Sequence, residues 1–410
     1  MKQILDLHIH SKYSRACSRD LELLNIAKAC EIRGIDIVAT GDFTHPAWFA
    51  HIKENLIEDG EGIYKLSPAP QGCRASQTKF IIGTEIASIK KHKDKTHRLH
   101  LLIFAPNLEV AEKFNKVLME RGFNLKSDGR PILGMTAKDI LTLMLETDER
   151  MVMIPAHAWT PWFGVFGAKG GYDSLEDCFE DLTPYIFAIE TGLSSNPLMN
   201  WRLSALDKIA LVSNSDAHSL GKLGREANVM NFFSKISYAE IMRIIRAKNK
   251  KEFLHTIEFY PEEGKYYADG HKDCGFFCLP AETKKLKGLC PKCKRPLVIG
   301  VLNSEAKKIS AKGGPASGWN TIPYKSLVPL PEILADVYQV GVNTKTVKAE
   351  YDNLIAKFGN EFYILLQAEL KKIKQASNNN IANAIERVRS GKINIRPGYD
   401  GEFGAVKVFE

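Results

Sequence analysis

Long hydrophobic runs are missing from this sequence, because no stretch approaches 18 consecutive apolar residues, so a membrane-spanning helix is not expected. The sequence also lacks internal repeats, and its only biased tract is the short run Asn378–Asn380. An apolar signal-peptide core is absent as well, because His8 and His10 stand where it would lie. We therefore expect a globular protein of the cytoplasm.

Acidic residues are nearly missing from one stretch of the chain. Between Lys284 and Lys312, nine Lys and Arg residues stand against one acid, Glu305, and this excess of eight equals the net charge of +8 for the whole chain. Such a basic cluster is typical of a nucleic-acid contact, although a solvated lysine-rich face would have the same composition. We expect this stretch to contact DNA. The candidate contact residues are Lys292, Lys294 and Arg295.

Cysteine is sparse outside one cluster. Four of the eight cysteines stand singly, as reduced cysteines of cytosolic proteins usually do. They are Cys17, Cys30, Cys73 and Cys178. The other four form the pairs Cys274-x3-Cys278 and Cys290-x2-Cys293, separated by eleven residues. Two close thiolate pairs predict a tetrahedral structural zinc site with these four cysteines as ligands, whereas two disulfides or free thiols would be the alternative.

Short β-rich runs alternate with helical patterns over residues 1–250, which predicts an α/β fold with a parallel sheet or barrel. The predicted strands are Ile4–Ile9, Ile35–Thr40, Phe80–Ala87, Leu99–Phe104, Met151–Ala156, Ile186–Glu190 and Ala210–Ser213. The predicted helices between them include Leu21–Arg33, Glu109–Arg121, Ala137–Glu146 and Leu198–Asp207. Seven strands over this length suit a barrel related to the eight-stranded kind.

A different pattern follows residue 250. Residues 251–312 contain the cysteine pairs and are predicted to form a zinc-ribbon module, and residues 313–410 are predicted to form a helical C-terminal domain that contacts DNA. The expected helices are Glu332–Val340, Thr344–Phe358 with Asn343 as its N-cap, Glu361–Lys374 and Ile381–Ser390. The runs Ile393–Ile395 and Ala405–Phe409, joined by a turn at Pro397–Gly401, predict a terminal hairpin.

Histidines and carboxylates recur where the predicted strands end. His8 and His10 form an H-x-H pattern, whose spacing points both rings to one face of an extended chain. The later strand ends carry Asp42 with His45, Glu85, His100, His157, and Asp216 with His218. The C-terminal strand ends of a β/α barrel meet at one rim, so these metal-ligand types can gather there. Singly, each has a structural explanation: Glu85 could be a buried paired carboxylate, and Asp20 could cap the following helix.

These motifs resemble those of the PHP (polymerase and histidinol phosphatase) family over about residues 1–250. LDLHIHSKYS, ATGDFTHP, GTEI, HLLIF, PAHAW and SNSDAH follow the family's order. The resemblance implies a distorted (β/α)7 barrel that holds two or three divalent metals (Zn, Mn, Fe or Mg) and hydrolyses phosphoesters. The family's second motif is usually Thr-Asp-His, whereas this chain has Thr40-Gly41-Asp42, with His45 three residues later. Alignment on Thr40 favours Asp42 as the ligand, and His45 is the alternative.

The PHP resemblance also implies which residues hold each metal. The first metal would be held by His8, His10, Glu85 and Asp216. Glu85 would bridge to a second metal held by His100 and His157. A third would be completed by Asp20, His218 and either Asp42 or His45. Adjacent divalent metals activate a bound water and clamp the oxygens of an in-line displacement at phosphorus, so Glu85 and Asp216 are the expected catalytic carboxylates.

A closer resemblance, to a group of DNA-repair nucleases of archaea and some bacteria, covers the whole chain and includes ETGLSSNP (Glu190–Pro197) and PGYDGEFG. It implies an endonuclease that cuts DNA on the 5′ side of deaminated bases (uracil, hypoxanthine or xanthine) or of abasic sites. Such an enzyme needs a pocket for an extruded base. The pocket candidates, which could equally be loop packing, are Trp159, Trp162, Ser194, Ser195 and Asn196.

Three other functions remain open from the sequence. The chain could be a PHP-type small-molecule phosphatase, a 3′–5′ proofreading exonuclease, or a DNA-binding protein without catalytic activity. The basic cysteine module and the helical tail favour the endonuclease. A sliding clamp is a further candidate partner, although no clear clamp-binding peptide is present.

Overall fold

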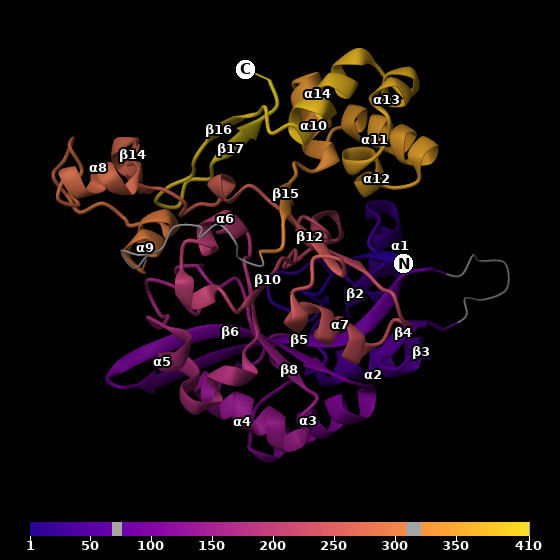
Figure 1. The fold of residues 1–410 in the computed structure, drawn as a ribbon, viewed down its shortest axis with the longest axis vertical. Coiled ribbons are helices and arrows are strands. Elements are labelled where there is room, and N and C mark those ends of the chain that lie inside the picture. Colours follow the sequence, from indigo (N-terminus) through magenta and orange to yellow (C-terminus); the bar gives the residue numbers. More distant parts are fainter. Residues whose placement is uncertain (68–75, 309–320, 410) are drawn as a thin grey trace.

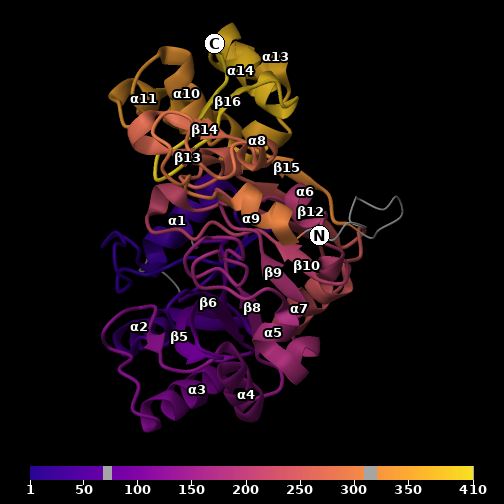
Figure 2. The ribbon, with the colours of Figure 1, turned by 90° about the vertical axis from the view of Figure 1, so that its left-hand side faces the viewer.

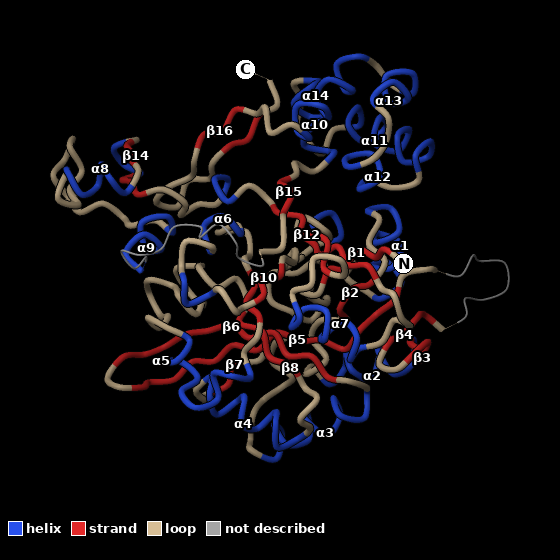
Figure 3. Tube along the Cα trace, viewed as in Figure 1, coloured by secondary structure: helices blue, strands red, loops and turns tan. Residues whose placement is uncertain are grey.

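The computed structural model describes residues 1–67, 76–308 and 321–409, and a mixed sheet surrounded by helices forms its centre (Figures 1 and 3). Eleven strands form this sheet, in the order β15-β12-β11-β1-β2-β5-β4-β3, with β6 and β7 beside β5 and β8 beside β6. The strands are β1 (Lys2–Asp6), β2 (Ile37–Ala39), β3 (Leu56–Gly60), β4 (Ile63–Leu66), β5 (Lys79–His92), β6 (Lys95–Ala105), β7 (Ile132–Leu133), β8 (Val152–Pro155), β11 (Ala227–Asn231), β12 (Phe253–Glu258) and β15 (Tyr324–Ser326). A separate parallel pair consists of β9 (Ala188–Glu190) and β10 (Ala210–Val212). The predicted α/β class is confirmed.

All seven predicted strands are present, as β1, β2, β5, β6, β8, β9 and β10. Their directions differ from the prediction, because β6 runs antiparallel to both β5 and β8. A tight turn at Lys93 and Asp94, both with positive φ, joins β5 directly to β6 and leaves no room for a crossover helix. Beyond residue 250, β12 and β15 extend one edge of the sheet. The closed seven-stranded barrel remains a prediction.

Helices cover the outside of the sheet. They are α1 (Leu23–Arg33), α2 (Pro46–Asn55), α3 (Leu108–Glu120), α4 (Ala137–Thr147), α5 (Leu175–Phe179), α6 (Pro197–Asn200) and α7 (Tyr238–Ala247). The predicted helix Leu198–Asp207 is wrong: α6 ends at Asn200, and only Ser204–Leu206 forms a further 3-10 turn. The Asn200 side chain donates to the Asn196 carbonyl oxygen, and such local bonds compete with helix continuation.

The cysteine module and a group of helices follow the sheet. The module contains β13 (Asp269–His271), β14 (Phe276–Cys278), α8 (Pro280–Lys285) and α9 (Val301–Lys308). The helical group contains α10 (Leu330–Tyr338), α11 (Lys345–Phe358), α12 (Glu361–Leu366), α13 (Leu370–Ala376) and α14 (Asn379–Arg389). Figures 1 and 2 place this group at one end of the molecule and α3 and α4 at the other. The predicted domain boundary at residues 312 and 313 lies outside the described residues.

Two details of the helical group differ from the prediction. Thr344, not Asn343, is the N-cap of α11, and its side chain accepts a hydrogen bond from the Val347 backbone N–H. The predicted helix Glu361–Lys374 is two helices, α12 and α13. Arg389 explains this break, because its guanidinium donates to backbone carbonyls at the end of α12 that a continuous helix would use internally.

The predicted terminal hairpin is confirmed as β16 (Asn394–Arg396) paired with β17 (Ala405–Lys407). Its loop is hydrogen bonded to the turn that follows β12: Gly398 N–H donates to the Glu262 carbonyl oxygen at 2.7 Å, and Gly404 N–H donates to the Glu263 carbonyl oxygen at 3.1 Å. A Cβ atom at Gly404 would lie 2.1 Å from the Glu262 carbonyl oxygen, so only glycine permits this approach. The PGYDGEFG segment thus connects the C-terminal hairpin to the sheet.

A buried ion pair joins α1 to the helical group. The Arg33 guanidinium contacts Glu361 Oε1, and the two side chains are only 8% and 1% exposed. Glu361 also accepts hydrogen bonds from Leu330 N–H and from the Tyr351 hydroxyl, each at 2.8 Å. Gly34 lies at the same contact, because a Cβ atom there would be 2.5 Å from Asn360 Oδ1.

Glu361→Ala is therefore expected to lower the free energy of unfolding by about 3–5 kcal/mol, because it leaves the Arg33 charge buried without its partner. Urea unfolding followed by circular dichroism measures the change. Glu369→Ala is the matched control, since Glu369 pairs with Lys372 on the surface and both side chains are more than 60% exposed; an exposed pair contributes about 0–1 kcal/mol. Equal effects of the two substitutions would contradict the structural role of the Arg33–Glu361 pair.

In the part of the chain that the structure describes, no helix has both the length and the apolar character that a membrane crossing requires.

Candidate metal centre

Six of the predicted ligand side chains lie together in two groups that share one carboxylate. The first group consists of His8, His10, Glu85 and Asp216, and the second consists of Glu85, His100 and His157. Within each group, one potential ligand atom per residue lies within 4.8 Å of all the others. The residues come from β5, β6 and the segments that directly follow β1, β8 and β10. The ends of β1, β8 and β10 and the middle parts of β5 and β6 therefore bring together side chains that are more than 200 residues apart in the sequence.

The two groups lie below the surface but are open to solvent on one side. His8, His10 and Glu85 are at most 1% exposed. The side chains of Asp216 and His218 are 25% and 34% exposed, so these two lie at the entrance. A substrate can therefore approach the groups from the side of Asp216.

Hydrogen bonds to the outer ring nitrogens orient two of the histidines. His8 Nδ1 lies 3.1 Å from both carboxylate oxygens of Glu190, and His157 Nδ1 lies 2.6 Å from Thr160 Oγ1. Their Nε2 atoms consequently face Glu85. His8 Nε2 is buried without a hydrogen-bond partner, at 3.6 Å from Glu85 and 3.5 Å from Asp216. A divalent cation would satisfy this nitrogen, and a histidine whose other nitrogen is held by a carboxylate is the usual form of such a ligand.

Asp42 has the same orienting role for His10. Its Oδ1 lies 3.0 Å from His10 Nδ1, and its Oδ2 accepts hydrogen bonds from the Ser11 N–H and hydroxyl at 2.6 and 2.7 Å. Burial would raise the pKa of Asp42, but His10 and Ser11 outweigh it and lower the pKa below its usual value. Asp42 thus lies behind His10 and belongs to neither ligand group, which differs from its predicted place in a third metal site.

The other side chains predicted for the third site, those of Asp20, His45 and His218, also belong to neither ligand group. His45 precedes α2, and its ring stacks on Tyr13 with 4.3 Å between centroids. Asp20 is exposed, and it precedes α1 by too many residues to be its N-cap, which is Glu22. The His218 ring lies 4.6 Å from the His10 ring, and its Nδ1 donates to the Asp216 carbonyl oxygen at 2.8 Å. Among the described residues, these side chains form no third group of ligands.

Two residues without a predicted role contact the groups. Glu190 accepts hydrogen bonds from the His157 backbone N–H and from Asn214 Nδ2, each at 2.8 Å, besides its contact with His8. Arg130 Nη1 donates to Glu85 Oε2 at 2.9 Å. Glu190 is the last residue of a predicted strand, and a carboxylate in that position is a signal that could have identified it. Arg130 lies in the loop before β7, and no sequence signal marks it.

The charges in the pocket favour a bound cation. Burial would raise the pKa of Glu85, but His100, His8 and Arg130 outweigh it, so this pKa lies well below its usual value. Burial lowers the pKa of His100 to about 4, and its imidazole is therefore in the neutral form that binds metals. Burial opposes protonation of His8 too, yet Glu190, Asp216 and Glu85 raise its pKa well above normal. The carboxylates thus attract positive charge into the site.

The five base-pocket candidates divide into buried and accessible residues. Trp159 is 1% exposed and donates from Nε1 to Asn200 Oδ1, and Ser195 is fully buried and donates to the Thr191 carbonyl oxygen. Neither offers a surface to a base, which corrects their predicted role. Asn196 is the N-cap of α6. Trp162 is 50% exposed and Ser194 is half-buried, so these two remain accessible.

The cysteine module differs from its predicted ligand set in one member. The side chains that converge are His271, Cys274, Cys290 and Cys293. Cys278 lies outside this group, and its Sγ is 3.2 Å from Thr283 Oγ1. β13 and β14 pair in antiparallel fashion, and the turn between them places His271 beside Cys274. Three thiols and one imidazole fit tetrahedral zinc.

The three DNA-contact candidates of this module, Lys292, Lys294 and Arg295, are all exposed.

Cys290→Ser is expected to remove one zinc per chain, because it removes one of the four converging ligands. Elemental analysis of the purified protein measures the loss. The same measurement on Cys278→Ser distinguishes the two ligand sets, and we expect this variant to retain its zinc because Cys278 Sγ is directed to Thr283. Cys17→Ser, outside the module, is the control. Loss of zinc from Cys278→Ser together with retention by His271→Ala would contradict the set seen in the structure.

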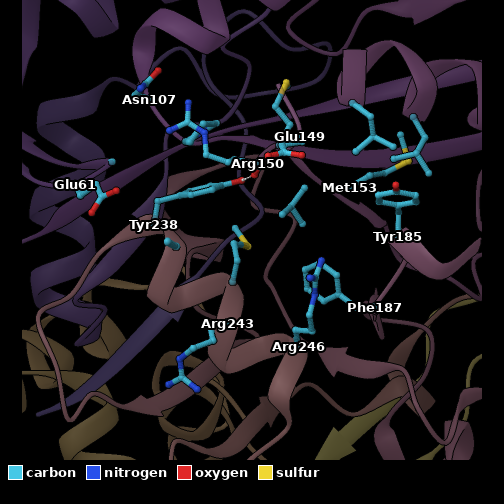
Figure 4. A pocket seen from close by; sticks show the side chains of 18 of the residues that line it. Glu61, Asn107, Glu149, Arg150, Met153, Tyr185, Phe187, Tyr238, Arg243 and Arg246 are labelled. Atoms are coloured by element: carbon cyan, nitrogen blue, oxygen red, sulfur yellow. Dashed lines mark hydrogen bonds between the residues drawn. The ribbon is translucent and has the colours of Figure 1, made fainter. Parts of the chain in front are cut away.

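A separate cavity of about 340 Å³ lies at the opposite ends of the strands, where residues such as Met151 and Phe187 precede β8 and β9 (Figure 4). The Arg246 guanidinium lies 4.4 Å from the centroid of the Phe187 ring, and the Tyr238 hydroxyl donates to the Arg150 carbonyl oxygen. None of the three ligand groups found in the described residues includes a residue of this cavity. It is therefore not part of the metal centre.

Comparisons with known proteins support a nuclease. A solved structure of a lesion-specific endonuclease from Pyrococcus furiosus superposes with a TM-score of 0.87 and 29% sequence identity, covering 100% of this chain and 96% of that chain. That protein is endonuclease Q. A second endonuclease Q structure, in complex with a 27-mer duplex substrate with an abasic lesion at the active site, has a TM-score of 0.85 and 29% identity, covering 100% of this chain and 97% of that chain. The motif-based recognition of an endonuclease Q-type nuclease is confirmed.

Two proteins that are similar in sequence also match most of this chain. The uncharacterized protein YqxK of Bacillus subtilis is 26% identical over 99% of this chain and 100% of its own length. The uncharacterized protein MJ0043 of Methanocaldococcus jannaschii is 28% identical over 65% of this chain, and the match spans about a third (34%) of the MJ0043 length. The MJ0043 C-terminal domain family matches residues 329–392, which contain the helical group α10–α14.

Proposed function

We propose that this protein is a DNA-repair endonuclease that hydrolyses the phosphodiester bond on the 5′ side of deaminated bases (uracil, hypoxanthine or xanthine) or of abasic sites. The observation that carries the proposal is that a chain similar to endonuclease Q over its whole length brings six metal-ligand side chains together, with Glu85 common to both groups. Lesion-containing DNA is accordingly the proposed partner.

The proposed metal ligands are those of the two groups in the candidate metal centre. His8, His10, Glu85 and Asp216 would hold one divalent metal (Zn, Mn, Fe or Mg), and Glu85, His100 and His157 would hold a second. When bound, such a pair of metals supplies an activated water and neutralises charge on the phosphate. We propose two metals rather than three, because both carboxylate oxygens of Asp42 are already hydrogen bonded, one to His10 and the other to Ser11. His271, Cys274, Cys290 and Cys293 would hold one structural zinc.

The chain's own residues prepare this site. Glu85 and Asp216, the proposed catalytic carboxylates, place two ionised groups beside the histidine Nε2 atoms, one on the buried side and one at the entrance. Glu190, Asp42 and Thr160 fix ring orientations, so little reorganisation is needed when substrate arrives. His218 lies beside Asp216 at the entrance, within reach of an incoming phosphodiester.

DNA contacts are proposed on the exposed basic residues Lys292, Lys294 and Arg295 of the zinc module and on the C-terminal helical group. Lys292 Nζ donates to the Cys274 carbonyl oxygen, which fixes its position next to the proposed zinc. Lysine and arginine in such positions bind phosphates without reading sequence. None of the seven cysteines that the structure describes forms a disulfide, which fits a site of action in the cytoplasm.

Duplexes that carry a single deoxyuridine, deoxyinosine, deoxyxanthosine or abasic site, each incubated with the protein and Mn²⁺, test the proposal. Single nicks on the 5′ side of the lesion are expected, with an undamaged duplex left intact. Progressive trimming from a 3′ end would indicate an exonuclease, and release of inorganic phosphate would indicate a phosphatase. DNA that is bound but uncut would indicate a binding protein. Each of these three outcomes would overturn the proposal.

A further inference from the structure

Arg130 places a cationic side chain at the entrance of the metal centre. Its Nη1 lies 2.9 Å from Glu85 Oε2, and its side chain is 22% exposed, close to the 25% of Asp216. The guanidinium therefore extends from the buried bridging carboxylate towards solvent. A phosphate that approaches the two ligand groups past Asp216 would meet it.

The backbone on either side of Arg130 is attached to two loops of the site and to strand β5. Gly129 N–H donates to the Tyr13 carbonyl oxygen at 3.0 Å, Thr44 Oγ1 donates to the Gly129 carbonyl oxygen at 3.4 Å, and Ala87 N–H donates to the Pro131 carbonyl oxygen at 3.0 Å. A Cβ atom at Gly129 would lie 2.4 Å from Asp42 Oδ2, so the segment packs directly against the carboxylate behind His10. Arg130 is thus held at a fixed position relative to the ligands.

The hydrogen-bonding capacity of Arg130 exceeds what the protein uses. A guanidinium has five N–H donors, and among the described residues the Arg130 guanidinium forms one hydrogen bond, from Nη1 to Glu85 Oε2. Glu85 Oε1 faces His100 and His157, at 3.0 and 3.2 Å, so Arg130 contacts the oxygen on the side of the first ligand group. The remaining donors suit a phosphodiester, because guanidinium binds phosphate oxygens in a bidentate manner.

A second arginine near the site, Arg225, differs in what it contacts: among the described residues it is paired with none of the ligand carboxylates. Arg225 Nη2 donates to the Ser215 carbonyl oxygen at 3.2 Å, and its guanidinium lies over the Phe259 ring at 5.8 Å. Its Nε is buried. Arg225 therefore supports the Ser215 loop from behind, whereas Arg130 reaches the entrance.

We propose that Arg130 binds the scissile phosphate and stabilises the negative charge that develops on it during hydrolysis. This inference rests on the proposed endonuclease function. It adds a positively charged substrate contact to a site whose other groups are metal ligands or hold those ligands in place.

Arg130→Ala is expected to lower kcat on the abasic duplex by about 10²–10³-fold, the usual effect of removing one donor to a developing oxyanion. The metal content per chain and the melting temperature are expected to stay unchanged, and added guanidinium ion is expected to restore part of the rate. Arg130→Lys should retain more activity than Arg130→Ala, because it keeps the charge but loses the bidentate geometry. Lys126→Ala removes one exposed positive charge from the same loop and is the matched control, with a rate within about twofold of wild type.

Three results separate the inference from the function on which it rests. A wild-type rate for Arg130→Ala would overturn the inference alone. A slow Arg130→Ala protein that has also lost the metals of the two ligand groups, without rescue by guanidinium, would show that Arg130 only supports Glu85, and this too would overturn it. If the wild-type protein itself leaves every lesion duplex uncut, the proposed function fails instead.

Discussion

Asp216→Asn is expected to abolish cleavage of a lesion-containing duplex while DNA binding is largely retained. Asp216 Oδ1 lies 3.1 Å from His10 Nε2 and 3.5 Å from His8 Nε2, so this oxygen occupies the middle of the first ligand group. The two rings outweigh burial and lower the pKa of Asp216, which is ionised at neutral pH. An amide has no negative charge to hold a cation, and we expect the cleavage rate to fall by about 10³-fold or more.

A gel-based nicking assay and a fluorescence binding assay on the same abasic duplex measure the two properties of Asp216→Asn. Asp94→Asn is the matched control, because it makes the same chemical change at a fully exposed turn between β5 and β6. The control is expected to cut at the wild-type rate. Retained cleavage by Asp216→Asn would count against the site, and lost binding would show a role in DNA contact that the structure does not suggest.

Glu85→Gln is expected to impair both ligand groups, whereas Asp216→Asn changes the first group alone, because Glu85 is the one residue common to both groups. It contacts His100 and His157 through Oε1 and His10 through Oε2. Loss of its charge should weaken both ligand groups, so that the protein loses the metals of these two groups together with at least about 10³-fold in cleavage rate. The zinc of the cysteine module should remain.

Elemental analysis after dialysis against a weak chelator measures how many metal ions each variant retains. Glu112→Gln is the control, since Glu112 pairs with Lys53 on the surface and its side chain is 60% exposed. We expect the control to keep the metals of both ligand groups and Glu85→Gln to keep only the structural zinc. A Glu85→Gln protein with full metal content would mean that the shared carboxylate does not bridge the two groups.

The positions of four of the six ligands could be predicted because they depend on strand ends, which are visible in the sequence, whereas Glu85 and His100 lie within the long strands β5 and β6. β8 and β10 are short apolar runs, and His157 and Asp216 follow them within a few residues. His8 and His10 likewise follow β1. Once such strands lie side by side, the residues at their ends must be neighbours, whatever their distance along the chain.

Features that depend on contacts between distant segments could not be predicted in this way. The choice of His271 over Cys278 depends on the turn after β13 and on Thr283, not on cysteine spacing. Asp42 and His10 pair only in the folded chain, so the sequence could not show that Asp42 orients a ring instead of joining a third site. The partner of the Arg130 guanidinium, Glu85, is 45 residues away in the sequence, and the hydrogen bonds of Gly129 and Pro131 together with the packing of Gly129 against Asp42 bring Arg130 to the entrance.

Diffraction from crystals of the protein grown with Mn²⁺, recorded at the manganese absorption edge, tests the central claim most directly. Two anomalous peaks are expected in the candidate metal centre, one among His8, His10, Glu85 and Asp216 and the other among Glu85, His100 and His157. Crystals that show no manganese at either position, while the same protein nicks lesion DNA, would contradict the assignment of these residues as the metal ligands of the active site.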